Sequence, residues 1–146
     1  MGPDRETAGG TPTGTPGPDV LRRTVTVDRA RLLAYADASG DQNPIHQDAG
    51  FARSVGLEDV IAHGMWTMGA ALDVVTSYAG GDPARVLSCS TKFTGMVVVP
   101  EGETVEVLVQ GVVKRSDEEA GTRTLELTVT CGGQKVLGRC QAVVRA

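Results

Sequence analysis

The segment from Gly64 to Tyr78 constrains the fold of this chain more than any other feature. It carries one charged side chain, Asp73, and is otherwise apolar or small on nearly all sides of a helical projection. A helix that is apolar around its circumference is normally a buried one. The pattern therefore predicts a central helix over residues 64–78, ended by the turn residues Gly80 to Pro83. The small side chains from Gly69 to Ala71 favour close contact with a sheet.

The last third of the sequence has the pattern of strands. Alternating or β-branched apolar residues fill the stretches 86–99, 104–114, 123–130 and 135–144. Gly95 in the first stretch indicates a bulge or bend, and Gly132-Gly133 predicts a tight hairpin turn before the last. We expect an antiparallel meander of four or five strands that curls around the central helix, which is an α+β architecture.

The N-terminal part divides into an arm and the start of a folded body. Residues 1–18 contain five Gly, four Pro and four Thr, and offer little apolar surface to bury. We therefore expect a disordered arm there, followed by a single domain over residues 19–146. The first elements expected in that domain are a short strand at Thr24 to Val27, a helix from Asp28 to Gly40 and a short helix near Asp48 to Ser54.

Charge and hydropathy exclude several classes of function. The net charge of −4 and the isoelectric point near 5.1 argue against a nucleic-acid partner, which requires a basic face. No apolar run is long enough to span a membrane, and the N-terminus lacks the regions of a signal peptide. We expect no membrane association and a cytoplasmic location.

Cysteine and histidine usage predicts no metal site. Cys89, Cys131 and Cys140 are odd in number and show no C-x-x-C spacing, so free thiols in a reducing compartment are expected. The two histidines, His46 and His63, are not spaced from the cysteines as zinc ligands are. Neither a metal nor another cofactor is expected.

The stretch from Asp41 to His46 is the most informative about function. Pro44 fixes its own φ and pushes Asn43 out of the α region, so we expect a stiff, extended turn. The turn presents a carboxylate and an imidazole, the groups that activate a water and move a proton. The first amides of the helix that begins at Gly64 are suited to holding a developing negative charge. These parts suit the addition of water to a polarised double bond, or its removal.

Each of these residues also has a purely structural explanation. Asp41 before Asn-Pro is a common turn former, and His46 fits an ordinary loop histidine. For His63 a structural role, filling the turn and bonding backbone groups, is favoured over catalysis, and a glycine such as Gly64 also starts helices that carry no site. Asp73 is placed facing solvent or a subunit contact. Three apolar residues near the helix start are better explained as core than as an acyl or cofactor site: Met65, Trp66 and Met68.

Two motifs give the chain a family resemblance. Residues 35–46 (YADASGDQNPIH) and 61–65 (IAHGM) resemble the MaoC-like dehydratases, whose pattern is Y-A-x-x-S-G-D-x-N-P-I-H followed by I-A-H-G-M. This family includes the (R)-specific enoyl-CoA hydratases and the catalytic subunits of (3R)-hydroxyacyl-ACP dehydratases. The resemblance continues more weakly through 92–94 and 99–103. At Pro18 to Val27 the chain departs from it, because the glycine-centred entry to the first strand is missing.

The resemblance implies a fold and a chemistry. The fold is the hot dog fold, an antiparallel sheet wrapped around a long helix, and the substrate is an acyl thioester. Asp41 and His46 would form the catalytic pair and the Gly64 amide the oxyanion donor, with Asn43 and His63 in supporting roles. The implied reaction is reversible hydration of a trans-2-enoyl thioester to the (R)-3-hydroxyacyl thioester. Which of the catalytic pair is acid and which is base stays open at this point.

Two other functions stay open as alternatives. A hot dog acyl-thioesterase usually needs a carboxylate near the start of the long helix, but the first acidic residue after His63 is Asp73, about three turns in. The other alternative is a partner subunit that shapes the acyl pocket of a heteromeric dehydratase.

The expected partners are an acyl-CoA or acyl-ACP substrate and a second hot dog subunit. An exposed sheet edge favours self-association, so we expect at least a homodimer or a heterodimer. Four basic residues are candidates for contacting the carrier of the acyl group: Lys92, Lys114, Arg115 and Arg123. Their spacing does not distinguish coenzyme A from an acyl carrier protein, and the acyl length is equally undetermined.

Overall fold

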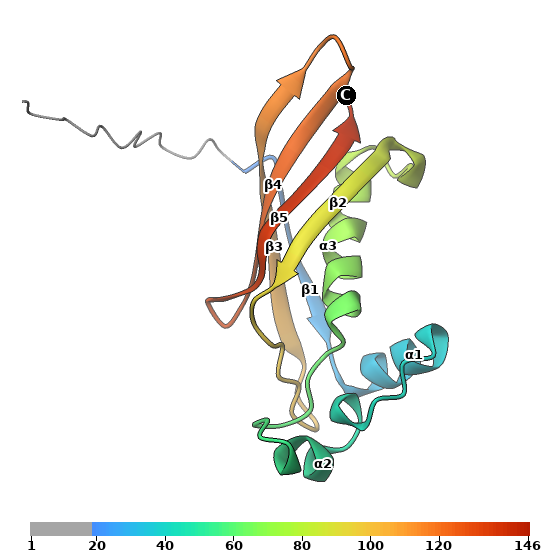
Figure 1. Ribbon diagram of the computed structural model, residues 1–146, viewed down its shortest axis with the longest axis vertical. Coiled ribbons are helices and arrows are strands. Elements are labelled where there is room, and N and C mark those ends of the chain that lie inside the picture. The colour runs from blue at the N-terminus through green and yellow to red at the C-terminus, as the bar shows by residue number, and fades with distance from the viewer. Residues whose placement is uncertain (1–18) are drawn as a thin grey trace, which may run out of the picture.

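The computed structural model describes residues 19–146 as an antiparallel sheet packed against one long helix (Figure 1). The expected disordered arm, residues 1–18, lies outside the described residues. The five strands of the described part are β1 (Leu21–Val27), β2 (Val86–Phe93), β3 (Val105–Asp117), β4 (Thr122–Cys131) and β5 (Gln134–Arg145), in the sheet order β1-β3-β4-β5-β2. The helical elements are α1 (Arg29–Ser39), η1 (Pro44–His46), α2 (Ala49–Ser54), α3 (Gly64–Tyr78) and η2 (Pro83–Arg85).

Alternating apolar residues of the central strands form the core, as their period of two predicted. Val107, Val109, Leu125 and Val129 have no exposed surface, and they belong to the same buried apolar cluster as Val74 and Val75 of α3. The turn between β4 and β5 uses Gly132-Gly133, both with positive φ, as expected for a tight hairpin. The prediction of an α+β hot dog fold, with the sheet curled around one long helix, is confirmed.

The central helix begins and ends where the sequence predicted, but it is not buried on all sides. Its buried residues are Trp66, Thr67, Ala71, Val74 and Val75, which lie on the face toward the sheet. The opposite face, which includes Met65, Gly69 and Asp73, is exposed. The predicted core role of Met65 and the predicted sheet contact of Gly69 are therefore wrong. The sheet of one chain covers only one side of the helix, which the sequence pattern alone does not reveal.

Asp73 is explained by an ion pair on this exposed face. Its carboxylate accepts a hydrogen bond from the Arg23 guanidinium of β1, and both side chains are in contact with solvent. The first strand is longer than predicted, because it starts at Leu21 and pairs with β3 along its full length. No helix among the described residues is long and apolar enough to cross a membrane.

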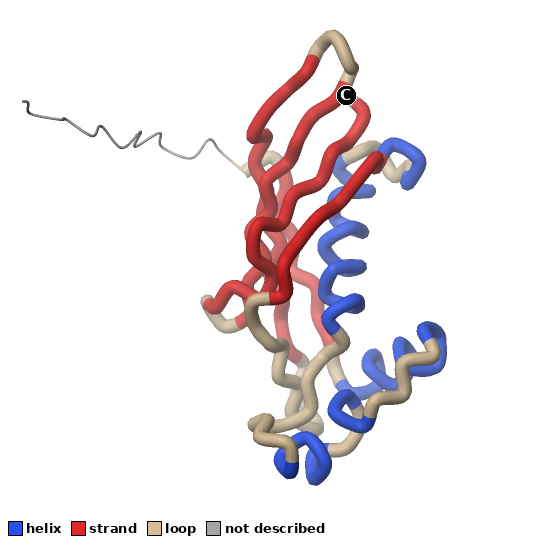
Figure 2. The backbone as a smooth tube through the Cα atoms, in the orientation of Figure 1, coloured by secondary structure: helices blue, strands red, loops and turns tan. Residues whose placement is uncertain are grey.

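Three short helical elements occupy the end of the molecule where α3 begins (Figure 2). The Asp28 side chain caps α1 by accepting from the Arg31 amide, and Asp48 caps α2 by accepting from the Phe51 amide. Gly40, at φ 78°, ends α1 in the left-handed conformation that a glycine tolerates. The predicted helices at 28–40 and 48–54 are thus confirmed. Residues Pro44–His46, expected to be extended, form one turn of 3-10 helix instead.

The chain entering α3 is fixed by contacts to its neighbours. The Ala62 amide donates to the Val97 carbonyl at 2.8 Å, and the Val99 amide donates to the Val60 carbonyl at 2.8 Å. Arg29 at the start of α1 joins both segments, because it donates to the Val99 carbonyl at 2.6 Å and to the Asp59 carboxylate at 2.8 Å. The segment from Asp59 to Ala62, which leads into α3, is therefore held in place before the helix begins.

Candidate active site

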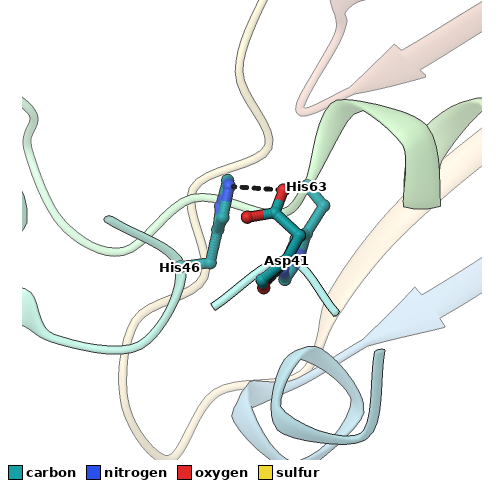
Figure 3. A group of neighbouring side chains, drawn as sticks. All are labelled: Asp41, His46 and His63. Carbon is teal, nitrogen blue, oxygen red and sulfur yellow. Dashed lines mark hydrogen bonds and ion pairs between the residues drawn. The ribbon is translucent and has the colours of Figure 1, made fainter. Parts of the chain in front are cut away.

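Asp41, His46 and His63 come together at the N-terminal end of α3 (Figure 3). Asp41 follows α1, His46 ends η1, and His63 is the residue just before α3. The sharp turn between the first two is built locally. The Asp41 carboxylate accepts from the Asn43 amide at 3.2 Å, and the Asn43 side chain accepts from the Ile45 amide at 3.2 Å. Asn43 therefore shapes the turn as expected.

A backbone carbonyl orients the His46 ring and fixes its tautomer. His46 is buried, and its Nδ1 lies 2.7 Å from the carbonyl oxygen of Ile61. Because a carbonyl can only accept, Nδ1 carries the proton in the neutral ring and Nε2 carries a free lone pair. Nε2 lies 4.0 Å from Oδ2 of Asp41, whose side chain is about half exposed (52%). The two groups face each other at a distance too long for a direct hydrogen bond.

His63 lies beneath this pair and is almost fully enclosed. Its Nε2 donates to the Asp41 carbonyl at 3.1 Å, so it holds the backbone of the acidic residue. Its ring stacks on His46 with centroids 3.8 Å apart and meets the edge of the Tyr35 ring at 4.7 Å. Its Nδ1 is buried without a hydrogen-bond partner among the described residues. Burial lowers the pKa of His63 below its ordinary value, and the neighbouring His46 adds to this effect, whereas the hydrogen bond to Asp41 and its charge oppose it.

The three residues lie close enough together for a metal site, because one ligand atom of each lies within 4.8 Å of the others. An imidazole binds a metal along the lone pair in the plane of its ring. The rings of His46 and His63 are stacked 3.8 Å apart with only 22° between their planes, so their lone pairs lie in two nearly parallel planes and do not converge on one point beside the rings. The arrangement suits a pair of proton-handling groups better than a metal site.

Two hollows meet at this cluster. An open cleft is lined by Tyr35, Ser39, Asp41, His63, Gly64, Met65 and Phe93. An apolar pocket lies next to it and is lined by His46, Ile61, Ala62, Gly64, Thr67, Phe93, Gly95, Met96, Val97, Val136 and Leu137. Asp41 thus faces the cleft while His46 faces the pocket. Only Gly64 and Phe93 belong to both.

The start of α3 lacks a side-chain cap. His63 occupies the N-cap position but makes no side-chain hydrogen bond to the helix, in contrast to the capping aspartates of α1 and α2. The first amides of a helix have no acceptor within the helix itself. Gly64 is exposed and lines both hollows, so the start of the helix lies at their junction.

The structure brings together every residue that the sequence marked for the site: Asp41, Asn43, His46, His63 and Gly64. Sequence reasoning missed the Ile61 carbonyl, which sets the tautomer of His46, and the contacts of Tyr35 and Phe93. Tyr35 opens the first motif, and Phe93 lies in the weaker stretch of resemblance at 92–94. Both residues therefore lie within the stretches that carry the family resemblance, but their contacts could be seen only in the folded chain.

Comparison with known proteins supports the resemblance. Residues 12–130 match the family model described as MaoC like domain, and the chain belongs to this family. It is 36% identical over 90 residues to the probable enoyl-CoA hydratase 2 of Dictyostelium discoideum, a match that covers 61% of this chain and 30% of that protein. It is 33% identical over 97 residues to the mitochondrial 3-hydroxyacyl-[acyl-carrier-protein] dehydratase of Arabidopsis thaliana, covering 66% of this chain and 56% of that protein. The chain thus spans less than two thirds of either relative.

Solved structures show the same architecture. A MaoC-like dehydratase superposes with a TM-score of 0.84 at 31% identity, covering 91% of this chain and 41% of that one. The (R)-hydratase from A. caviae involved in PHA biosynthesis superposes with a TM-score of 0.74, covering 90% of this chain and 98% of that one. At 24% identity, this second likeness establishes the shared fold.

Proposed function

We propose that this protein catalyses the reversible hydration of trans-2-enoyl thioesters to (R)-3-hydroxyacyl thioesters. The observation that carries the proposal is the placement of His46 Nε2 and Asp41 Oδ2, 4.0 Å apart, beside the uncapped start of α3. The names of the two relatives, an enoyl-CoA hydratase and a 3-hydroxyacyl-[acyl-carrier-protein] dehydratase, support the same reaction.

The spacing of the two side chains suits one water molecule. Both atoms are acceptors when His46 is neutral and Asp41 is ionised, so a single water donates one hydrogen to each. For a water oxygen about 2.8 Å from both atoms, the angle between the directions to Nε2 and to Oδ2 is roughly 90°. This is near the angle between the two O–H bonds of water. The lone pairs of the water are then free to attack an alkene carbon of the substrate.

We propose that His46 is the proton acceptor, which the free lone pair on its Nε2 supports. In the hydration direction, the water oxygen forms a bond to carbon 3 while one of its protons moves to Nε2 of His46. The electrons of the double bond move toward the thioester oxygen as an enolate. The proton then passes from Nε2 to carbon 2, which restores the carbonyl and the neutral imidazole. Asp41 holds the water and stabilises the positive imidazolium between these steps.

The Gly64 amide supplies the remaining requirement, a donor for the developing oxyanion. It is the first amide of a 15-residue helix, whose dipole adds to the attraction for negative charge. His63 holds the Asp41 backbone through its Nε2, and we assign it a positioning role. Asn43 fixes the turn that carries the pair. No step of this mechanism requires a metal or another cofactor.

The two alternatives find less support. A thioesterase would need a carboxylate carried by the first turns of α3 itself, but the one acidic residue of that helix, Asp73, lies about three turns in, pairs with Arg23 and lines neither hollow of the site. A pocket-shaping partner subunit would not need the paired acid and base that this chain carries. Neither alternative is favoured by a specific contact.

We also propose that the active form is at least a dimer of hot dog subunits. Strands β1 and β2 stand at the two edges of the sheet, each paired on one side only. The edge strand β2 exposes two large apolar side chains, Leu87 and Phe93. Free strand edges and exposed apolar residues favour association.

The carrier and the compartment are further parts of the proposal. Of the basic residues considered for carrier binding, Lys114 pairs with Glu126 and Arg123 contacts Tyr78 at the far end of α3. Lys92 precedes Phe93 on β2 and is the candidate that adjoins a residue of the site in the sequence, and a basic side chain there suits either a coenzyme A phosphate or an acidic carrier protein. The free thiols of Cys89, Cys131 and Cys140 favour a reducing compartment, and we place the protein in the cytoplasm.

Incubation with crotonyl-CoA tests the proposed reaction. We expect the enoyl absorbance to fall without release of free thiol, and the product to be the (R)-3-hydroxy thioester by chiral chromatography. Thiol release at the same rate would identify a thioesterase. Absence of both signals, with coenzyme A and with acyl-carrier-protein thioesters, would contradict the proposed reaction.

A further inference from the structure

Phe93 holds an unusual position for a large apolar residue. It is the last residue of β2 and is 55% exposed, so it adds little to the core. Its ring nevertheless lies directly on Gly64. A Cβ atom added to Gly64 would come within 3.1 Å of both Cδ1 and Cε1 of Phe93. The ring therefore covers the start of α3, next to the amide assigned to the oxyanion.

The same ring separates the two hollows of the site. The cleft holds Asp41 and the apolar pocket holds His46, and only Gly64 and Phe93 line both. A substrate whose reacting carbons contact both catalytic side chains must therefore lie across the contact between Gly64 and Phe93. The width of that passage depends on the Phe93 side chain, because glycine has none.

The apolar pocket is small and closed at its inner end. Val97, Val136 and Leu137 are each 2% exposed and form its floor. Gly95 closes one wall, because a Cβ there would lie 2.6 Å from the Lys135 carbonyl oxygen. The volume is about 170 Å³. For comparison, an engineered apolar cavity of about 150 Å³ holds one benzene molecule, which has six carbons.

We propose that Phe93 is a specificity-determining residue that confines the acyl chain to this pocket and so restricts the enzyme to short acyl groups. This inference rests on the proposed hydratase function. The thioester and its carrier lie in the open cleft, and the alkyl group beyond carbon 3 enters the pocket past Phe93. An acyl tail larger than about six carbons exceeds the space beneath the ring. Removing the ring joins the pocket to the cleft and admits longer chains.

The test compares kcat/KM for crotonyl-, hexenoyl-, octenoyl- and dodecenoyl-CoA across three proteins. Beyond carbon 3 the three shorter substrates carry at most five carbons and fit the pocket, whereas dodecenoyl-CoA carries nine. The wild type should therefore prefer the three shorter substrates, with a drop of at least about tenfold to dodecenoyl-CoA, since a methylene that a pocket cannot accept costs roughly 10- to 200-fold. Phe93→Ala should raise the ratio of dodecenoyl to crotonyl turnover at least about tenfold. Phe93→Leu should give an intermediate ratio, and it retains an apolar side chain should the alanine variant fold poorly.

Leu87→Ala is the matched control, because Leu87 is also an exposed apolar residue of β2 but lines neither hollow. It should leave the chain-length ratio unchanged. Sedimentation of all variants measures whether each still associates. It therefore distinguishes a role of Phe93 in subunit contact from a role in the acyl pocket. If Phe93→Ala dissociates the protein and leaves the ratio unchanged, or if the wild type prefers dodecenoyl-CoA, Phe93 does not set the acyl length. Wild type that hydrates none of the four substrates contradicts the proposed function itself.

Discussion

The two ends of α3 satisfy their polar groups in different ways. At the C-terminal end, the Thr76 hydroxyl donates to the Leu72 carbonyl at 2.9 Å, and the Gly81 amide donates to the Thr76 carbonyl at 2.9 Å. Asp73, one turn earlier, pairs with Arg23. At the N-terminal end the helix has no side-chain cap, and the adjacent His63 keeps a buried ring nitrogen without a partner in the described part of the chain.

This contrast indicates which end of α3 has polar groups to offer a ligand. Leaving a buried polar group without a partner costs about 1–3 kcal/mol, so such groups are few in stable proteins. The C-terminal end of α3, whose polar groups have the partners described above, carries no such cost. The N-terminal end gathers a carboxylate, two imidazoles and the first amides of the helix around two hollows, which is the arrangement that the proposed function requires. We therefore expect hydration activity to depend on residues at the N-terminal end of α3 and not on those at its C-terminal end.

The largest effect is expected from the catalytic pair. Asp41→Asn and His46→Ala should each lower kcat/KM for crotonyl-CoA by about 10²- to 10⁴-fold, because each removes a positioned proton-handling or water-holding group. Steady-state hydration rates measure this. Asp37→Asn is the matched control, since Asp37 bonds only to the exposed Gln42 side chain and lines neither hollow. Near-normal turnover by either site variant would contradict the assignment.

The second effect isolates the Gly64 amide. Proline is favoured at the first position of a helix, and the preceding His63 has φ −59° and ψ 132°, values that proline accepts in its neighbour. Gly64→Pro therefore removes the N–H while keeping the helix. Gly64→Ala adds the same contact with Phe93 but keeps the N–H. We expect kcat/KM of the proline variant to be about 10²- to 10³-fold below that of the alanine variant. Equal rates would exclude the amide as the oxyanion donor.

The third effect is on stability as a function of pH. Burial lowers the pKa of His63 in the folded state, so the unfolded chain binds a proton more readily than the folded one. Stability is therefore full above the unfolded pKa near 6.5 and is lost as the pH falls toward the folded pKa. His63→Gln keeps a donor for the Asp41 carbonyl but does not titrate. Urea unfolding at pH 5 to 8 should show less acid loss for His63→Gln than for wild type, and parallel curves would contradict this.

The local elements of the fold were predictable because their signals are local. The span from Gly64 to Tyr78 and the caps at Asp28 and Asp48 follow from residues close to one another in the sequence. The start of β1 was not predictable, because Leu21 joins the strand by pairing with Gly111 of β3. Full burial of α3 was wrong for a similar reason. How many sides of a helix are covered depends on the layers around it.

The features of the site also fall into those that the sequence could mark and those that depend on the folded chain. Asp41 and His46 could be marked because they share one short turn with Pro44, and the second motif placed His63 and Gly64. The tautomer of His46 could not be predicted, since it depends on the Ile61 carbonyl, which belongs to a different segment. The contact of Phe93 with Gly64 likewise arises only when β2 packs beside the start of α3. The catalytic roles of these residues stay predictions until the variants are measured.

The smallest effect is expected at the satisfied end of α3. Asp73→Asn breaks the ion pair with Arg23, whose side chains are 73% and 41% exposed. Exposed pairs contribute about 0–1 kcal/mol, so the free energy of unfolding should fall by no more than that, and less at high salt. Crotonyl-CoA hydration should be unchanged. A double-mutant cycle with Arg23→Gln in urea unfolding measures the pair directly. If Asp73→Asn instead lowered hydration as strongly as Asp41→Asn, catalysis would not be confined to the N-terminal end of the helix, and the thioesterase alternative would need to be reconsidered.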